Sequence, residues 1–461
     1  MPETVRFAPS PTGELHIGNV RTALFNWFAA LSTRGTFVLR YDDTDVARSK
    51  AAFAEQIAAD MAWLGITPHR VERQSERIAA YDAAADKLRE AGLLYPCYET
   101  PQELDRKRSR QRARGLPPVY DRAGLGLTQD ERAAFEAEGR RPHWRFKLPS
   151  GAREFEDRCR GSQTVNLGTV SDPVLVREDG TYLYTLPSVV DDMDFGVTLV
   201  VRGEDHITNT GVQIALFEAL GGTVPAFAHH NLLIRSDGEP LSKRDNPLSI
   251  RALAEAGYER MAVASLASLT GTSHPVAAAP DLETLAATVS LGDVSRAPAT
   301  FDPAELSRLN ASIVHALPVE AVNGLLANVA ADKQLFWQTI RGNIALRTEV
   351  SPWVARLNAR AAGVAHDPAP TTADDRAVIA VAIKLLPPAP WDDGTFKAWT
   401  AAVGQETGAK GKRLFMPLRI GLTGLTSGPE LSPWLQLLGP EGARKSLEAA
   451  LAAHEAGGGV A

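Results

Sequence analysis

Two segments that lie far apart in the chain carry residues suited to phosphate chemistry. In the first, His16 precedes Gly18 and Asn19 in a stretch that begins at Pro9. Glycine at the start of a helix lets a phosphate approach backbone N–H groups at the positive end of the helix dipole, and an imidazole just before it can donate to a phosphoryl oxygen. The second segment places two adjacent cations on a loop, which suits charge developing on a transferring phosphate; it consists of Leu241, Ser242, Lys243 and Arg244.

Neither segment is specific by itself. A single histidine in a helix-entry loop is usually structural, and a short basic loop is usually a solvated surface. The position of both segments changes this interpretation, because each follows a predicted strand of a parallel sheet. Ligands of open α/β sheets bind beyond the carboxyl ends of the strands, so the two segments are predicted to meet at one site.

The elements that would position this site alternate between strand and helix. Strands are predicted at 5–9, 37–41, 197–201 and 231–234. Between the first two, apolar residues recur at helical spacing from Val20 to Leu31, and a further helix is predicted to end near Leu64. This order predicts an α/β fold with a Rossmann-like parallel sheet.

Five segments follow from the pattern along the chain. The catalytic domain is predicted in two halves, at 1–95 and 186–240, separated by an inserted α+β module at 96–185 with short alternating segments and a basic run. A basic loop and connecting region follows at 241–300. An all-helical domain is predicted at 301–461. It opens with a helix-start pattern, in which Asp302 is the N-cap, proline follows it, and Glu305 comes three residues later.

Composition limits the class of protein. The length of 461 residues fits about three domains. The net charge of −6 means that a polyanionic partner must meet a local basic surface. Cys97 and Cys159, the two cysteines, fit a reducing compartment. With no apolar run near 18 residues and no signal-peptide pattern, neither membrane insertion nor export is expected, and the predicted location is the cytoplasm.

Several motifs together resemble those of one enzyme family. His16-Ile-Gly-Asn19 resembles the HIGH signature and Pro240-Leu-Ser-Lys-Arg244 the KMSKS signature of class I aminoacyl-tRNA synthetases. Within that class the chain resembles bacterial glutamyl-tRNA synthetases. The further motifs, in the expected order, are Arg40-Tyr-Asp-Asp-Thr-Asp45, Ser188-Val-Val-Asp-Asp192, Arg202-Gly-Glu-Asp-His206 and Leu414-Phe-Met-Pro-Leu-Arg419.

Some positions depart from the family pattern. Asn19 replaces the last histidine of HIGH, and Pro240 replaces the first lysine of KMSKS. Asp42 stands where many bacterial members have glutamate, and Ser188 and His206 stand where asparagine and tryptophan are common. Because no second cysteine lies near Cys97, the zinc site that some relatives carry is not expected here, and no metal ligand is assigned.

The resemblance implies a two-step reaction. ATP, with Mg²⁺, activates L-glutamate as glutamyl-adenylate, and the glutamate is then attached to the 3′ end of tRNA(Glu), releasing AMP and diphosphate. His16 and Lys243 are the implied catalytic residues. The implied ATP-binding residues are Pro9, Gly18, Asn19, Leu241, Ser242, Lys243 and Arg244.

Arginine suits a substrate with two carboxylates because its planar fork binds them through paired hydrogen bonds. The resemblance assigns Arg6 to the side-chain carboxylate, Arg202 to the neighbourhood of the α-carboxylate and Asp42 to the ammonium group. Tyr184 and Ser10 would add hydrogen bonds, and Ser188 and His206 complete the implied glutamate pocket.

The tRNA partner would meet two basic segments. Arg106, Lys107 and Arg108 lie in the inserted module, where the alternative interpretation is a solvated helix face. Lys410, Lys412 and Arg413 lie in the helical domain. The resemblance implies a monomer and leaves open whether tRNA(Gln) is also charged.

Three alternative functions share some of these sequence features. A shorter paralogue that transfers glutamate to the modified base queuosine lacks an anticodon domain, whereas this chain continues far beyond residue 300. Glutaminyl-tRNA synthetases carry β-barrel anticodon modules, for which strand patterns are missing. A non-catalytic tRNA-binding homologue would not need His16, Lys243 and both arginines.

Overall fold

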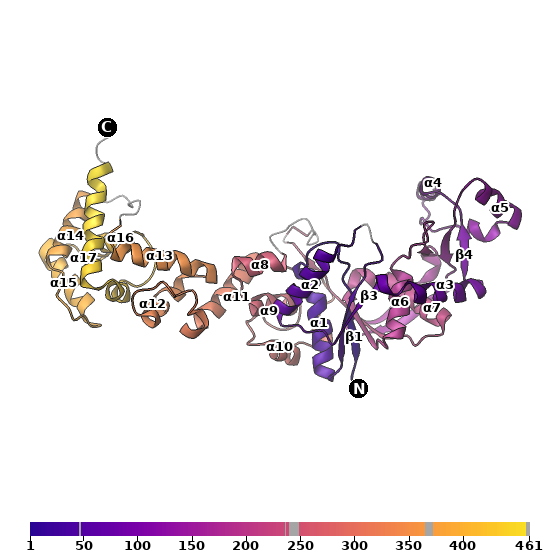
Figure 1. Ribbon diagram of the computed structural model, residues 1–461, viewed down its shortest axis with the longest axis horizontal. Helices are drawn as coiled ribbons and strands as arrows, with labels where there is room; N and C mark the ends of the chain where they lie inside the picture. The colour runs from indigo at the N-terminus through magenta and orange to yellow at the C-terminus, as the bar shows by residue number, and fades with distance from the viewer. Residues whose placement is uncertain (46–47, 236, 239–248, 365–371, 458–461) are drawn as a thin grey trace. The chain divides into compact units, whose positions relative to one another are not determined.

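The structure is a computed structural model, and it describes the whole chain except residues 46–47, 236, 239–248, 365–371 and 458–461, together with the side chains of 453–457. The described residues form two compact units. The first comprises 1–255 and 260–303, and the second comprises 256–259 and 304–461 (Figure 1).

The first unit is built on a parallel sheet. Its central strands are β1 (Thr4–Phe7), β2 (Thr36–Tyr41), β3 (Arg70–Arg73), β9 (Leu199–Gly203) and β10 (Ala226–His230). β2 pairs in parallel with β1 and β3, and β9 pairs in parallel with β10. The N–H of Thr198, just before β9, donates to the carbonyl of Thr4 at 2.9 Å, so the two sets of strands adjoin. The predicted Rossmann-like fold class is confirmed.

One strand was placed wrongly from the sequence. The prediction put a strand at 231–234, but the long strand in this region is β10, and residues 233–234 form only the short β11 (Leu233–Ile234), which pairs with β12 (Ala299–Thr300). β10 reads Ala-Phe-Ala-His-His and lacks the β-branched residues that favour strands. It forms nevertheless because it is buried beside β9, where all five of its residues pair.

Helices cover both faces of this sheet. α1 (Ile17–Thr33) packs on β1, β2 and β9 and against α9 (Arg260–Leu269), whereas α6 (Thr185–Asp194) and α7 (Ile207–Leu220) lie on the other side (Figure 1). A cluster of Val38, Val200, Ile214 and Phe227 joins α7 to the sheet. Further α-helices of the first unit are α2 (Ala51–Leu64), α3 (Ile78–Glu90), α8 (Ile250–Ala256) and α10 (Leu282–Thr288).

The segment predicted as an inserted module is divided between two sheets. β4 (Leu94–Cys97), β5 (His143–Phe146) and β8 (Val174–Val176) form a separate antiparallel sheet beside α4 (Pro101–Ala113) and α5 (Gln129–Ala137). The hairpin of β6 (Ala152–Asp157) and β7 (Gly161–Asn166) instead extends the catalytic sheet, because β6 pairs in parallel with β10 at Asp157 and Phe227.

The regular elements in the described part of the second unit are all helices. They are α11 (Pro303–Ala316), α12 (Lys333–Ile340), α13 (Val350–Ala361), α14 (Ala373–Lys384), α15 (Thr395–Thr407), α16 (Lys412–Thr423) and α17 (Leu431–Gly457). Their apolar faces enclose a core that contains Phe336, Trp337, Trp399 and Trp434. None of the helices that the structure describes has the length and apolar composition of a membrane span.

Candidate active site

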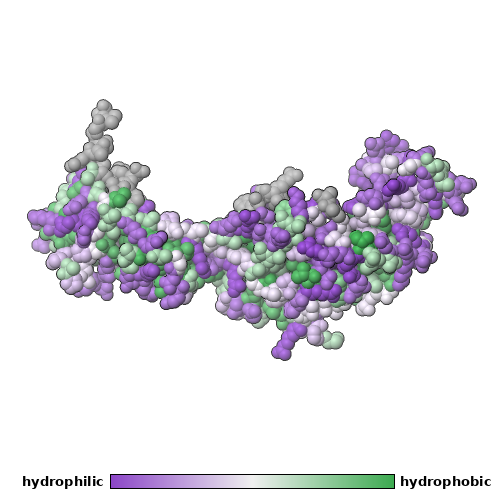
Figure 2. Space-filling model, viewed as in Figure 1, coloured by the Kyte–Doolittle hydropathy of each residue, from purple (hydrophilic) through white to green (hydrophobic). Residues whose placement is uncertain are grey.

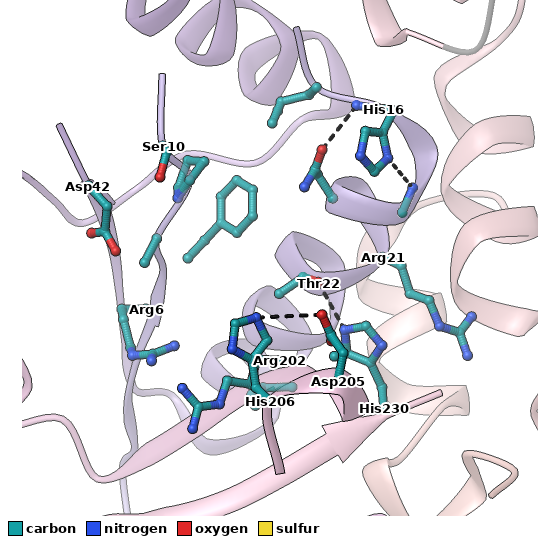
Figure 3. A pocket seen from close by; sticks show the side chains of 18 of the residues that line it. Arg6, Ser10, His16, Arg21, Thr22, Asp42, Arg202, Asp205, His206 and His230 are labelled. Carbon is teal, nitrogen blue, oxygen red and sulfur yellow. Dashed lines mark hydrogen bonds and ion pairs between the residues drawn. The ribbon is translucent and has the colours of Figure 1, made fainter. Parts of the chain in front are cut away.

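A cavity of about 610 Å³ opens at the carboxyl ends of β1, β2 and β9 (Figure 3). It brings together all the predicted ATP and glutamate residues that the structure describes. These are Arg6, Pro9, Ser10, His16, Gly18, Asn19, Asp42, Tyr184, Ser188, Arg202 and His206. The predicted residues Leu241, Ser242, Lys243 and Arg244 lie outside the described residues.

His16 is the N-cap of α1, and its hydrogen bonds fix the tautomer of its ring. The ring Nδ1 of His16 accepts from the backbone N–H of Gly18 at 3.2 Å. The backbone N–H of His16 donates to Oδ1 of Asn19 at 3.3 Å. A ring nitrogen that accepts carries no proton, so the proton of the neutral imidazole resides on Nε2. His16 is therefore a hydrogen-bond donor through Nε2.

Gly18 lies against the ring of His16. Its N–H donates to Nδ1 of His16 at 3.2 Å. A Cβ at this position would lie 3.0 Å from Cε1 of His16, so glycine leaves room for the imidazole against the first turn.

A buried ion cluster lies beneath the cavity, centred on Arg40 of β2. Its Nε contacts Oδ1 of Asp42 at 2.7 Å and its Nη1 contacts Oδ1 of Asp192 at 2.9 Å. Asp192 also accepts from Nε of Arg6 at 3.1 Å. Burial raises the pKa of Asp42, although the charge of Arg40 opposes this. No role was predicted for Arg40, although it stands out in the sequence as a charged residue inside the apolar strand at 37–41.

Arg202 has different surroundings. Its described hydrogen-bond partners are all neutral: Thr210 Oγ1 at 2.6 Å, Gln213 Oε1 at 2.7 Å and His229 Nε2 at 3.3 Å. Burial, and then the neighbouring charge of Arg6, lower the pKa of Arg202 to about 10. Figure 3 shows both guanidinium groups pointing toward the same part of the cavity. An anion placed between them would relieve their mutual repulsion.

The remaining predicted glutamate residues surround these arginines. Ser188 is 2% exposed on α6 and accepts from Nη2 of Arg40 at 3.4 Å. Tyr184 precedes α6, and its ring meets that of His206 edge to face at 6.3 Å between centroids. Burial, followed by the charge of Arg202, lowers the pKa of His206, which favours its neutral form. Ser10 is exposed in the loop after β1.

Two further cavity residues were missed. Arg21 of α1 is fully buried and donates to the carbonyls of Ala267 and Thr270 at 2.7 and 2.8 Å. His230 of β10 contacts Thr22 Oγ1 through Nε2 at 2.9 Å, and burial, together with the charge of Arg21, lowers its pKa to about 3. Arg21 was not predicted because it lies within an apolar helical pattern, and His230 was not predicted because β10 was not recognised as a strand.

The predicted tRNA residues lie on polar surfaces. Arg106 and Arg108 are exposed on α4, a helix without buried residues, and Figure 2 shows mostly hydrophilic residues over α4 and α5. Arg108 forms an ion pair with the exposed Asp105 at 2.9 Å, and Lys107 forms ion pairs with Glu99 at 3.0 Å and Asp121 at 3.1 Å. In the helical unit, Lys410, Lys412 and Arg413 are exposed just before and at the start of α16.

One cluster in the β4–β5 sheet has metal-ligating side chains. Potential ligand atoms of Cys97, Glu99 and His143 lie within 4.8 Å of one another. The carboxylate of Glu99 already accepts from Lys107 and from Tyr120 Oη at 2.9 Å. Burial raises the pKa of the Cys97 thiol to about 11, and the set supplies three ligand side chains where a structural zinc site has four. The set is therefore a poor fit for a structural zinc ion.

Two domain families match the chain. The model described as "tRNA synthetases class I (E and Q), catalytic domain" matches residues 4–307, and the one described as "Anticodon binding domain" matches 355–451. The chain belongs to the class I tRNA synthetases of the glutamate and glutamine group. The class I synthetase assignment made from the sequence is thus confirmed.

Individual synthetases similar to this one span nearly its whole length. A protein of Methylobacterium radiotolerans named "Glutamate--tRNA ligase 2" is 56% identical over 97% of this chain and 99% of its own. A protein of the same name from Methylobacterium sp. strain 4-46 is 57% identical over the same shares. Among solved structures, glutamate-tRNA synthetase from Elizabethkingia anophelis superposes with a TM-score of 0.84 at 25% identity, over 98% of this chain and 100% of that one.

Proposed function

We propose that this synthetase is an ATP-dependent glutamate–tRNA ligase. The observation that carries the proposal is one cavity, which has a histidine donor at a helix start and two guanidinium groups directed into it. The similarity to glutamate–tRNA ligases over almost the full chain supports the same activity. The helical anticodon-domain match argues against the shorter queuosine-modifying paralogue.

The first step forms glutamyl-adenylate. An oxygen of the glutamate α-carboxylate attacks the α-phosphorus of ATP, which enters with Mg²⁺ as substrate, and diphosphate leaves. Negative charge accumulates on the phosphoryl oxygens in the transition state. His16 donates to one of them through Nε2, and Lys243 supplies a positive charge. In the second step a hydroxyl of the terminal tRNA adenosine attacks the mixed anhydride, and AMP leaves.

Glutamate is recognised by charge. Its side-chain carboxylate accepts from Arg6, and the convergence of Arg202 on the same region favours a shared carboxylate over the separate α-carboxylate contact expected from the sequence. The described hydrogen-bond partners of Arg202 are neutral, so none of them forms an ion pair with its guanidinium group. Asp42 takes the ammonium group while it keeps its contact with Arg40. A neutral glutamine side chain would leave these cations underpaired, and its binding would be correspondingly weak.

The tRNA contacts involve exposed basic residues. Arg106 and Arg108 of α4 and Lys410, Lys412 and Arg413 near α16 contact the phosphate backbone. Lys107, paired with Glu99 and Asp121, holds the module together instead. A monomeric, cytoplasmic protein without structural zinc completes the proposal.

A charging assay tests the function and its breadth. Purified protein is incubated with ATP, radiolabelled glutamate or glutamine, and purified tRNA(Glu) or tRNA(Gln) in separate reactions. We expect glutamate on tRNA(Glu), and the tRNA(Gln) reaction decides whether that tRNA is also charged. Charging with glutamine, or no charging of either tRNA, would contradict the proposal.

A further inference from the structure

A buried network of hydrogen-bonded polar side chains lies behind Arg202, outside the cavity. It consists of Asp157 at the end of β6, His229 in β10 and Thr210 in α7, which are 4%, 0% and 0% exposed. The register of the sheet places His229 directly beside Arg202 on the neighbouring strand. Asp157, His229 and Thr210 do not line the cavity, and the proposed reaction does not use them.

The carboxylate of Asp157 fixes the tautomer of His229. Its Oδ1 accepts three backbone N–H groups, from Cys159, Arg160 and His229, at 2.9, 3.0 and 3.1 Å. Its Oδ2 lies 2.5 Å from Nδ1 of His229. Because a carboxylate can only accept, the ring proton resides on Nδ1. Burial lowers the pKa of His229, so the ring is neutral and Nε2 is an acceptor.

This acceptor faces the guanidinium group. Nε2 of His229 accepts from Nε of Arg202 at 3.3 Å and lies 2.9 Å from the hydroxyl of Thr210. The Thr210 hydroxyl accepts from Nη2 of Arg202 at 2.6 Å, so its own proton is free to donate. Its possible acceptors are Nε2 of His229 and the carbonyl of His206 at 3.3 Å, and His229 is the nearer. Gln213 binds the same Nη2 at 2.7 Å. One edge of the guanidinium is thus held by neutral acceptors, and Nη1 takes no part in these bonds.

We propose that His229, kept in its Nδ1-protonated form by Asp157, acts together with Thr210 as a pair of positioning residues that fix Arg202 for the glutamate carboxylate. A free arginine side chain loses much rotational freedom when it binds an anion. A guanidinium that is already fixed does not incur this loss on binding, so affinity rises. Because these hydrogen-bond acceptors are neutral, they do not offset the positive charge of Arg202, whereas a carboxylate acceptor would. This inference rests on the proposed role of Arg202 in binding glutamate.

His229→Asn tests the acceptor at constant charge. The asparagine amide can still donate to Asp157, but nothing replaces Nε2 opposite Arg202. We expect the KM for glutamate to rise by about ten- to a hundredfold, as for loss of a hydrogen bond to a charged group. The KM for ATP stays within about twofold, because Arg202 lies in the glutamate part of the cavity. A purely structural network would not separate the two constants in this way.

Thr210→Val and Thr210→Ser form a second, matched test. Valine has nearly the same shape without the hydroxyl, and its KM for glutamate is expected to rise at least about fivefold, whereas serine restores the wild-type value within about twofold. Thr400→Val is the control, because Thr400 is also buried but bonds only to carbonyls of its own helix. Thermal unfolding is measured for every variant, and the Thr210 pair decides the outcome if His229→Asn does not fold.

Arg202→Lys separates the proposed role of Arg202 from that of its positioning residues. If this variant leaves the KM for glutamate unchanged, the proposed role of Arg202 is wrong. If it raises that KM while His229→Asn and Thr210→Val remain within twofold of wild type, the positioning proposal alone is overturned. Equal rises in the KM values for glutamate and ATP in the His229 and Thr210 variants would also overturn it.

Discussion

Replacing Arg6 by methionine isolates the contribution of one guanidinium to glutamate binding. Methionine keeps a long side chain in the same buried position but removes the charge. The change is structurally clean because Asp192, the partner of Arg6, keeps its 2.9 Å contact with Arg40. The carboxylate of Asp192 is therefore not left as an unpaired buried charge, and we expect the variant to fold.

The magnitude follows from the burial of Arg6, which is 5% exposed. Losing a charge-assisted contact of this kind costs about 2–4 kcal/mol, since little water can replace it. This corresponds to a rise of roughly 30- to 900-fold in the KM for glutamate. ATP is proposed to bind at the His16 side of the cavity, so its KM should change by less than about threefold.

Aminoacylation of tRNA, with glutamate and ATP varied in turn, measures both constants. Arg153→Met is the control, because Arg153 forms an ion pair with Glu218 at 2.7 Å and does not line the cavity. Equal increases in both KM values for Arg6→Met, or a glutamate KM within threefold of wild type, would refute this reasoning.

Three further predictions concern other parts of the protein. Lys243→Ala should slow adenylate formation by roughly two to three powers of ten; a pre-steady-state rate within about threefold of wild type would rule out its catalytic role. His230, with its pKa lowered to about 3, stays neutral in the folded protein while the unfolded chain protonates near pH 6.5. The free energy of unfolding therefore falls as the pH is lowered from about 6.5 to about 3, by up to about 1.4 kcal/mol per pH unit from this residue. His230→Asn should flatten this part of the pH dependence. Exchanging Arg106 and Arg108 for glutamine should weaken tRNA binding and reduce its salt dependence. Lys107→Gln should leave that dependence unchanged, because Lys107 is paired with two carboxylates whereas Arg108 has one exposed partner, Asp105; equal effects would contradict this distinction.

Local pattern was sufficient to predict the core of this fold. The spacing of Val20, Leu24, Trp27 and Leu31 predicted α1, and apolar runs predicted β1, β2 and β9 to within about two residues. Because carboxyl ends of parallel strands share an edge, the residues after these strands were expected to meet, and they line one cavity.

Residues whose roles depend on tertiary partners could not be predicted in this way. β10 contains two histidines in place of typical strand residues and forms because β9 and β6 flank it. The hairpin of β6 and β7 looked like part of an insertion, but its membership of the catalytic sheet depends on a pairing about 70 residues away.

Buried charge was the other feature that single-sequence reasoning missed. The sequence shows Arg40 as a charged residue in an apolar strand, but its ion pairs with Asp42 and Asp192 depend on the folded structure. The same holds for Asp157 and His229, which are separated by 72 residues in sequence and joined by a 2.5 Å contact. Gly18 was predicted to let a phosphate approach the helix start, and the structure adds that a Cβ there would lie 3.0 Å from Cε1 of His16.

A crystal structure with a non-hydrolysable glutamyl-adenylate analogue would test the central claim most directly. The account predicts the side-chain carboxylate within hydrogen-bond distance of Arg6 and Arg202, and an oxygen of the phosphoryl mimic within hydrogen-bond distance of Nε2 of His16. An analogue bound with its side-chain carboxylate away from both guanidinium groups, or outside this cavity, would contradict it.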